Sequence, residues 1–147
     1  MTTAFKTVLD TVKAALMAAP AVAGGRIAYG RDDATPLGAA SDITLTLQAQ
    51  DGEPIALMGA PTDWTALLGV ELRARAGASQ DAWTAIDPYI EQVYQRLAAI
   101  HWPAGVTGVT GLRGRLDPAE AATAVASWQF VLTINFRTAP GSLALAP

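Results

Sequence analysis

The sequence contains no cysteine, a single histidine and few charged residues for its length of 147. The absence of cysteine excludes disulfides, thiolate nucleophiles and cysteine-based zinc sites, and it leaves the redox compartment open. His101 alone cannot form a histidine-based metal site, and its place at the end of an expected helix favours a capping role. The sequence therefore predicts no catalytic residue, no metal and no cofactor, so the function is to be sought in surfaces and assembly.

The chain also lacks a strong charge of one sign and a long hydrophobic run. Its net charge of −3 offers no basic footprint for nucleic acid or an anionic membrane. No window approaches about 18 apolar residues, and Lys6, Asp10 and Lys13 interrupt the N-terminal segment, so neither a membrane span nor a signal peptide is expected. We expect a soluble protein that stays in the compartment where it is made.

The low charged fraction has two readings. Charged residues make up 16% of the chain, against about 25% in an average protein. A chain whose surface is partly covered by partners shows such a deficit, and so does an alanine-rich chain from a GC-rich genome. The apolar share of 51% is enough for a core in either case, and the length fits one domain.

The clearest element is a strand over residues 125–137. Five large apolar residues occupy every second position, and mostly polar residues fall between them. This period-two alternation is typical of a strand with one buried face. The apolar positions are Trp128, Phe130, Leu132, Ile134 and Phe136.

Two helices are expected. Thr3 caps the first, which carries one apolar stripe and ends before Pro20. Ser79 or Asp81 caps the second, in which Pro88 predicts a kink or a later start near Asp87. The apolar stripe of the second helix consists of Trp83, Ile86, Ile90, Val93, Tyr94 and Leu97.

The remaining segments predict four further strands, over residues 26–29, 43–50, 68–75 and 106–116. Asp51-Gly52 is a turn signal, residues 53–65 are expected to form mainly a loop, and residues 117–120 to begin a connection with a helical turn. Glycine at every third position from Gly105 to Gly114 predicts a twisted or edge strand.

The fold class that follows is α+β, with a mainly antiparallel or mixed sheet of about five strands and two main helices packed on one face. Residues 1–137 are expected to form a single domain, and residues 138–147 a flexible C-terminal tail.

Two kinds of surface residue stand out. Asp32 and Asp33 are adjacent acids in a loop without a calcium-binding pattern, so they favour a solvated loop or a salt bridge to a neighbouring subunit. Trp64 and Trp102 fall in expected connections, which makes them candidates for interface anchors or for simple partial burial. Trp83 of the second helix and Trp128 of the last strand belong to apolar stripes, so both are expected in the core.

Three segments together resemble a known family. They are the arginine-bearing strand of residues 70–75, the helix of residues 80–97, and the last strand with its exit at residues 136–142, Phe-Arg-Thr-Ala-Pro-Gly-Ser. In this order they resemble the tail terminator proteins of long-tailed bacteriophages, the minor tail protein U group of lambda-like phages and prophages. The similarity extends from the first helix to Arg137 and rests on order, length and the Arg-Thr exit rather than on one motif.

The resemblance implies a structural virion assembly protein without catalysis. It implies a ring of six copies that caps the head-proximal end of the tail tube, stops its polymerisation and offers the docking surface for the head. The implied partners are further copies of the chain, the tail tube protein and a head-completion or connector protein. DNA passes through the ring without specific binding, no membrane is involved, and the location is the virion tail, assembled in the host bacterial cytoplasm.

A ring needs heterologous contacts, in which one patch meets a different patch on the next copy. The charged face of residues 70–75, with Glu71, Arg73 and Arg75, is one candidate patch, and the acidic loop of Asp32 and Asp33 is its candidate complement. The predicted interface set consists of both patches and three further residues: Asp32, Asp33, Glu71, Arg73, Arg75, Trp64, Trp102 and Arg137. Two alternatives stay open: a head–tail connector or neck protein, and a small-molecule-binding or enzymatic α+β domain that dimerises through its sheet.

Overall fold

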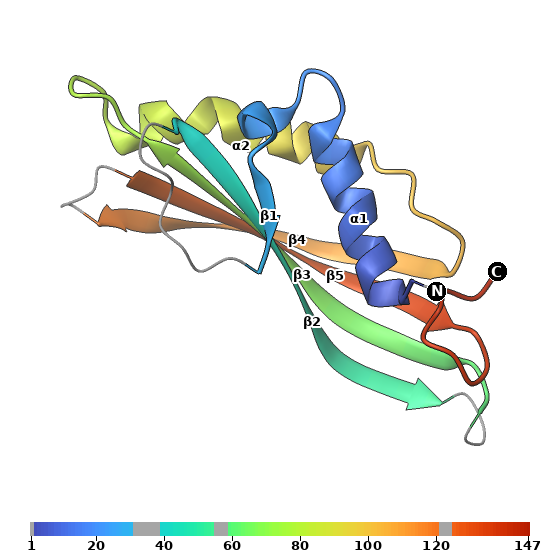
Figure 1. Ribbon diagram of the computed structural model, residues 1–147. Coiled ribbons are helices and arrows are strands. Elements are labelled where there is room, and N and C mark those ends of the chain that lie inside the picture. The colour runs from blue at the N-terminus through green and yellow to red at the C-terminus, as the bar shows by residue number, and fades with distance from the viewer. Residues whose placement is uncertain (1, 31–38, 55–58, 121–124) are drawn as a thin grey trace.

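The computed structural model describes residues 2–30, 39–54, 59–120 and 125–147 (Figure 1). Two α-helices, one short 3-10 helix and five strands follow one another along the chain. In order they are α1 (Ala4–Met17), η1 (Val22–Gly25), β1 (Ile27–Tyr29), β2 (Ser41–Pro54), β3 (Thr62–Arg75), α2 (Ala82–Ala98), β4 (Val106–Glu120) and β5 (Val125–Thr138).

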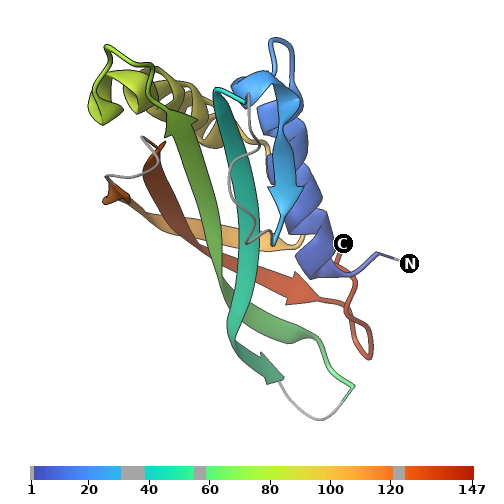
Figure 2. The same ribbon diagram turned by 60° about the vertical axis from the view of Figure 1, so that its left-hand side comes forward.

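The strands form one mixed sheet in the order β1-β2-β3-β5-β4. Strand β1 is parallel to β2, and the other neighbouring pairs are antiparallel. Strands β2 and β3 run together past β1 to their last paired residues, Pro54 and Thr62 (Figure 2). This part of the pair is called here the hairpin end. Strand β4 lies at the edge and changes register with β5 at three places. This arrangement confirms the predicted α+β class, and it confirms that the glycine-bearing strand lies at an edge.

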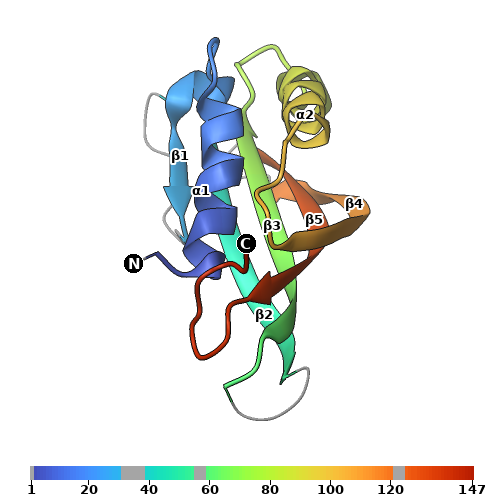
Figure 3. The same ribbon diagram turned by 90° about the vertical axis from the view of Figure 1, so that its right-hand side faces the viewer.

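Both helices pack on the same face of the sheet, as predicted (Figure 3). Helix α1 lies over β2, and α2 lies over β3 and β5. Every fourth residue of α1 is buried, and β5 alternates as its sequence predicts, with Phe130, Leu132, Ile134 and Phe136 on the buried side. Neither of these described helices is long and apolar enough to cross a membrane.

The expected turn at Asp51-Gly52 is wrong, because β2 continues through both residues to Pro54. Strand β3 likewise begins at Thr62, so both ends of the expected loop, residues 53–54 and 62–65, are strand. Gly52 pairs with Trp64, and a Cβ atom at Gly52 would lie 2.4 Å from the Trp64 ring. Glycine therefore makes room for the indole here, rather than marking a hairpin turn.

Two local expectations about proline-bearing segments are also wrong. Helix α2 begins at Ala82, not near Asp87, and its cap is the Asp81 side chain, as predicted. It is continuous through Pro88, and a kink there stays a prediction. Pro88 and Thr84 are both exposed, so water can satisfy the carbonyl that proline leaves without a donor. The helical turn expected at residues 117–120 is absent, because β4 extends through Glu120.

The segment after β5 folds back against the rest of the protein. The Ala4 amide donates to the Leu143 carbonyl at 2.7 Å, and the Ala146 amide donates to the Arg137 carbonyl at 2.8 Å. A Cβ atom at Gly105, whose φ is +89°, would lie 2.6 Å from the Ala146 carbonyl oxygen. These contacts hold residues 138–147 beside α1 and β4. The flexibility of this tail in solution stays a prediction, as does the division at residue 137.

Candidate functional site

The described residues contain no group that resembles a reaction centre. No three histidine, aspartate or glutamate side chains gather there as a metal site would need. One shallow hollow of about 290 Å³ lies between the hairpin end and the C-terminal segment. No ionisable side chain lines this hollow, which is formed by Gly59, Ala60, Thr62, Thr138, Gly141, Ser142 and Leu143. The candidate sites are therefore outer surfaces.

The first surface is the side of the sheet that no helix covers, called here the open face. Side chains on it alternate with the buried ones along β3 and β5, because successive strand residues point to opposite sides. One row across it joins Gln48, Leu67 and Thr133 on three neighbouring strands. Most of its side chains are neutral and polar: Thr46, Gln48, Thr65, Gln129, Thr133 and Asn135.

The predicted patch of Glu71, Arg73 and Arg75 lies on this open face, but its charges are engaged within the chain. Arg73 forms an ion pair with Asp42 at 2.9 Å, and their side chains are only 14% and 4% exposed. Glu71 accepts a hydrogen bond from the Ser127 hydroxyl at 3.1 Å. Arg75 is half-buried. The structure thus shows Arg73 as part of an internal pair, and the role of the three residues in a subunit contact stays a prediction.

The two predicted tryptophan anchors are tied into the fold. Trp64 lies on β3 rather than in a connection, packs edge-to-face on Phe5 at 5.2 Å and donates through its indole N–H to the Thr138 hydroxyl at 3.2 Å. Trp102 follows α2 and is half-buried against the core. Both arrangements account for their partial burial without a partner.

Arg137 forms an exposed two-point pair with Asp63 on the neighbouring strand. Its Nε and Nη2 atoms lie 2.7 and 3.0 Å from the two carboxylate oxygens. The hydrogen bonds from Arg137 hold the pKa of Asp63 below its usual value. The predicted acids Asp32 and Asp33 lie outside the described residues, so their role in a subunit contact stays a prediction.

Sequence reasoning missed an exposed stripe on α2. The prediction that Trp83 and Tyr94 belong to the core is wrong, because they are 53% and 47% exposed. Trp83 leans on Trp128 of β5 at 6.1 Å between ring centroids, so it faces the β4–β5 side of the molecule. Successive positions at i, i+4 and i+11 place Trp83, Asp87 and Tyr94 on one flank of the helix. The signal available in the sequence was that both aromatic residues lie at one margin of the apolar stripe.

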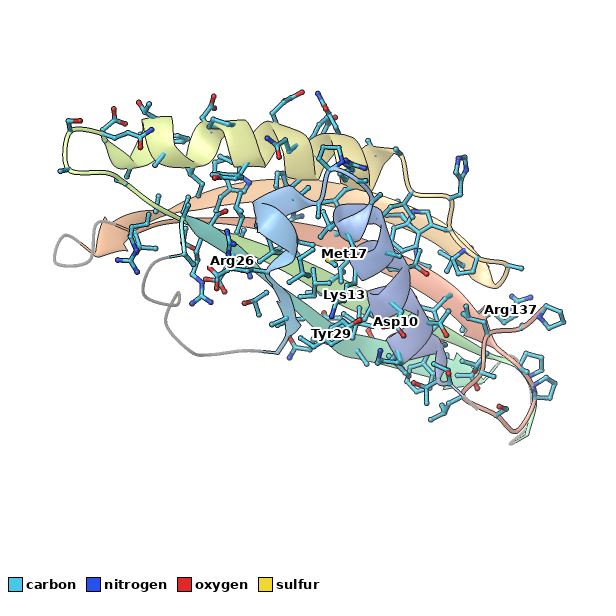
Figure 4. All side chains as sticks on the ribbon, turned by 45° about the horizontal axis from the view of Figure 1, so that its top comes forward. Asp10, Lys13, Met17, Arg26, Tyr29 and Arg137 are labelled. Carbon is cyan, nitrogen blue, oxygen red and sulfur yellow. The ribbon has the colours of Figure 1, made fainter. Side chains whose placement is uncertain are left out.

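A second stripe, exposed at Lys6 and Met17 and half-buried at Asp10 and Lys13, lies on the flank of α1 that faces β1 (Figure 4). Lys6, Asp10, Lys13 and Met17 follow the same helical spacing. The Tyr29 hydroxyl and the Lys6 ammonium both donate to the Asp10 carboxylate, and the Lys13 nitrogen lies 4.7 Å from the Tyr29 ring centroid. Hydrogen bonds from Lys6 and then Tyr29 lower the pKa of Asp10, whereas burial raises the pKa of Tyr29. This network attaches β1 to α1 and leaves cationic and apolar groups at the surface.

Comparison with known proteins adds a likeness of fold. No protein-family model and no curated protein sequence matches the chain. Among solved structures, a chain from the virion of a native gene transfer agent particle is similar, with a TM-score of 0.55 and 16% sequence identity. The alignment covers 86% of this chain and 92% of that one. The likeness therefore extends over nearly the whole fold, and at this identity it is a likeness of fold.

Proposed function

We propose that this protein is a structural component of a phage-like virion, and within it the tail terminator. Copies assemble into a ring of six at the head-proximal end of the tail tube. The ring ends tube polymerisation and presents the surface on which the head docks. The observation that carries the proposal is the likeness in fold to a chain of a gene transfer agent virion, which extends over 86% of this chain and 92% of the virion chain.

The surfaces of the chain support a role in assembly rather than in chemistry. The open face carries many hydroxyl and amide groups, and two of its charged residues, Glu71 and Arg73, bond within the chain. Affinity for DNA comes mainly from cationic groups that meet phosphates. A ring of chains with net charge −3 would therefore let DNA pass without holding it.

The proposed partners follow from this role. They are other copies of the chain, the tail tube protein below the ring and a head-completion or connector protein above it. The protein has no enzymatic activity or cofactor in this account. It resides in the virion tail after assembly in the cytoplasm of the host bacterium.

Removal of the gene from a particle-producing host tests the proposal. Without a terminator, tube growth has no stop, so electron microscopy should show tails of abnormal and variable length together with tailless heads. Expression of the wild-type chain from a plasmid should restore uniform length. Tails of normal length that remain unattached to heads would instead identify the protein as a connector or neck component, and normal particles would overturn both assignments.

A further inference from the structure

We infer that neighbouring copies contact one another through the two exposed helical stripes, with the α2 stripe of one copy seated on the α1 stripe of the next. The inference rests on the proposed function, since it names the surfaces that close the ring. The occupant of each stripe is a second copy of this chain.

The α2 stripe combines apolar area with negative charge. Trp83 and Tyr94 expose about half of their surface, and tryptophan and tyrosine are enriched among the residues that contribute most to the affinity of an interface. Asp87 and Glu91 are exposed beside them, and neither forms an ion pair within the described residues. The one arginine of the helix, Arg96, lies on the opposite flank and donates to the Pro20 carbonyl at 3.0 Å. The outer flank is thus acidic and aromatic, with no cation of its own.

The α1 stripe has the complementary character. Among the described residues, the exposed Lys6, the half-buried Lys13 and the exposed Arg26 are the cations of this region, and Asp10 is the carboxylate they surround. Arg26 also donates through Nε to the Ser41 carbonyl at 2.6 Å. Met17, 44% exposed, adds an apolar side chain at the end of the same stripe. Opposite charge on two patches steers them together and disfavours contact between like patches. An acidic and aromatic stripe therefore fits a basic and apolar one better than a copy of itself.

The two stripes lie on opposite sides of the molecule, which suits a ring. Both helices cover the same face of the sheet, but in Figure 3 β1 and α1 lie toward one edge of the sheet, and α2 and β4 lie toward the other edge. A contact between unlike patches on opposite sides is head-to-tail and repeats from copy to copy. A two-fold dimer would require each patch to meet itself, which the like charges oppose.

The sheet edges are poorer candidates for this contact. Strand β4 changes register with β5 at three places, and such bulges prevent an edge strand from pairing with another chain. At the other edge, β1 spans only three residues, and β2 continues past it with the exposed acids Asp51 and Glu53, whose charges oppose pairing of this edge with its own copy. Side-chain contact between helices therefore fits the molecule better than strand addition.

A charge exchange between the stripes tests the inference. Lys6→Glu with Lys13→Glu makes the α1 stripe acidic, and Asp87→Lys with Glu91→Lys makes the α2 stripe basic. In each double variant alone, stripes of the same charge would face each other across the contact. The concentration needed for assembly should therefore rise at least about tenfold. An equimolar mixture should recover assembly as rings in which the two variants alternate. Light scattering and native mass spectrometry measure both effects.

A control of equal charge change is available on the hairpin. Asp51→Lys with Glu53→Lys alters two exposed acids of β2 that belong to neither stripe, and should leave assembly unchanged. Thermal unfolding of each variant excludes loss of fold as the cause. If wild-type rings form and neither stripe variant affects them, the inferred contact is wrong while the proposed function stands. If the wild type forms no ring, alone or on tail tubes, the proposed function fails first.

Discussion

Replacement of Arg73 by glutamate is expected to lower the free energy of unfolding by about 3–5 kcal/mol. Arg73 lies 2.9 Å from Asp42, and both side chains are almost withdrawn from solvent. The substitution would leave the buried Asp42 carboxylate without its cation and place a second carboxylate beside it. Chemical denaturation of the purified variant measures the loss.

Arg113→Glu provides the matched control, since Arg113 belongs to β4 and is exposed. The same change of charge there should alter stability by no more than about 0.5 kcal/mol. Equal and small effects at both positions would contradict the buried pair. The expected loss also means that Arg73→Glu cannot test a subunit contact, because a variant that fails to fold fails to assemble for that reason alone.

Replacement of Phe136 by alanine should cost about 3–5 kcal/mol of stability and reduce the yield of soluble protein. Phe136 is 1% exposed, faces the helices and packs edge-to-face on Phe5 of α1 at 5.2 Å. The smaller side chain would leave a cavity where the strand and the helix meet. Urea denaturation followed by tryptophan fluorescence gives the size of the change.

Val131→Ala on the same strand serves as comparison, because Val131 points to the open face and is only half-buried. Its expected cost is about 1 kcal/mol or less. A larger effect at Val131 than at Phe136 would show that the two faces of β5 are reversed.

The fold was predictable wherever burial repeats with a clear period. Alternation over β5 predicted both the strand and its buried face, since a shift of one residue would expose every large side chain. The first helix and its Thr3 cap were equally predictable, because capping and the apolar stripe are local properties. Proline and glycine misled the prediction. Gly52 serves the packing of Trp64 across the strand pair, a tertiary contact that local turn statistics cannot express.

The site was predictable only in part. That Glu71, Arg73 and Arg75 share one face follows from strand periodicity, but the pair with Asp42 depends on the register of β2 against β3. Hydrophobicity alone placed Trp83 in the core. Trp83 is exposed because α2 packs on β3 and β5 with one flank only, and Trp83 lies on the flank that extends beyond this contact. The sequence pattern places Trp83 at the margin of the apolar stripe, but it does not show where the contact with the sheet ends.

The mass of the wild-type protein, measured by light scattering over a concentration series with and without purified tail tubes, tests the central claim most directly. Electron microscopy of the same samples shows the shape of any assembly. The account predicts closed rings of six copies, either free in solution or seated on one end of each tube. A protein that stays monomeric at every concentration and leaves tube ends bare, or one that forms only a two-fold dimer, would contradict it.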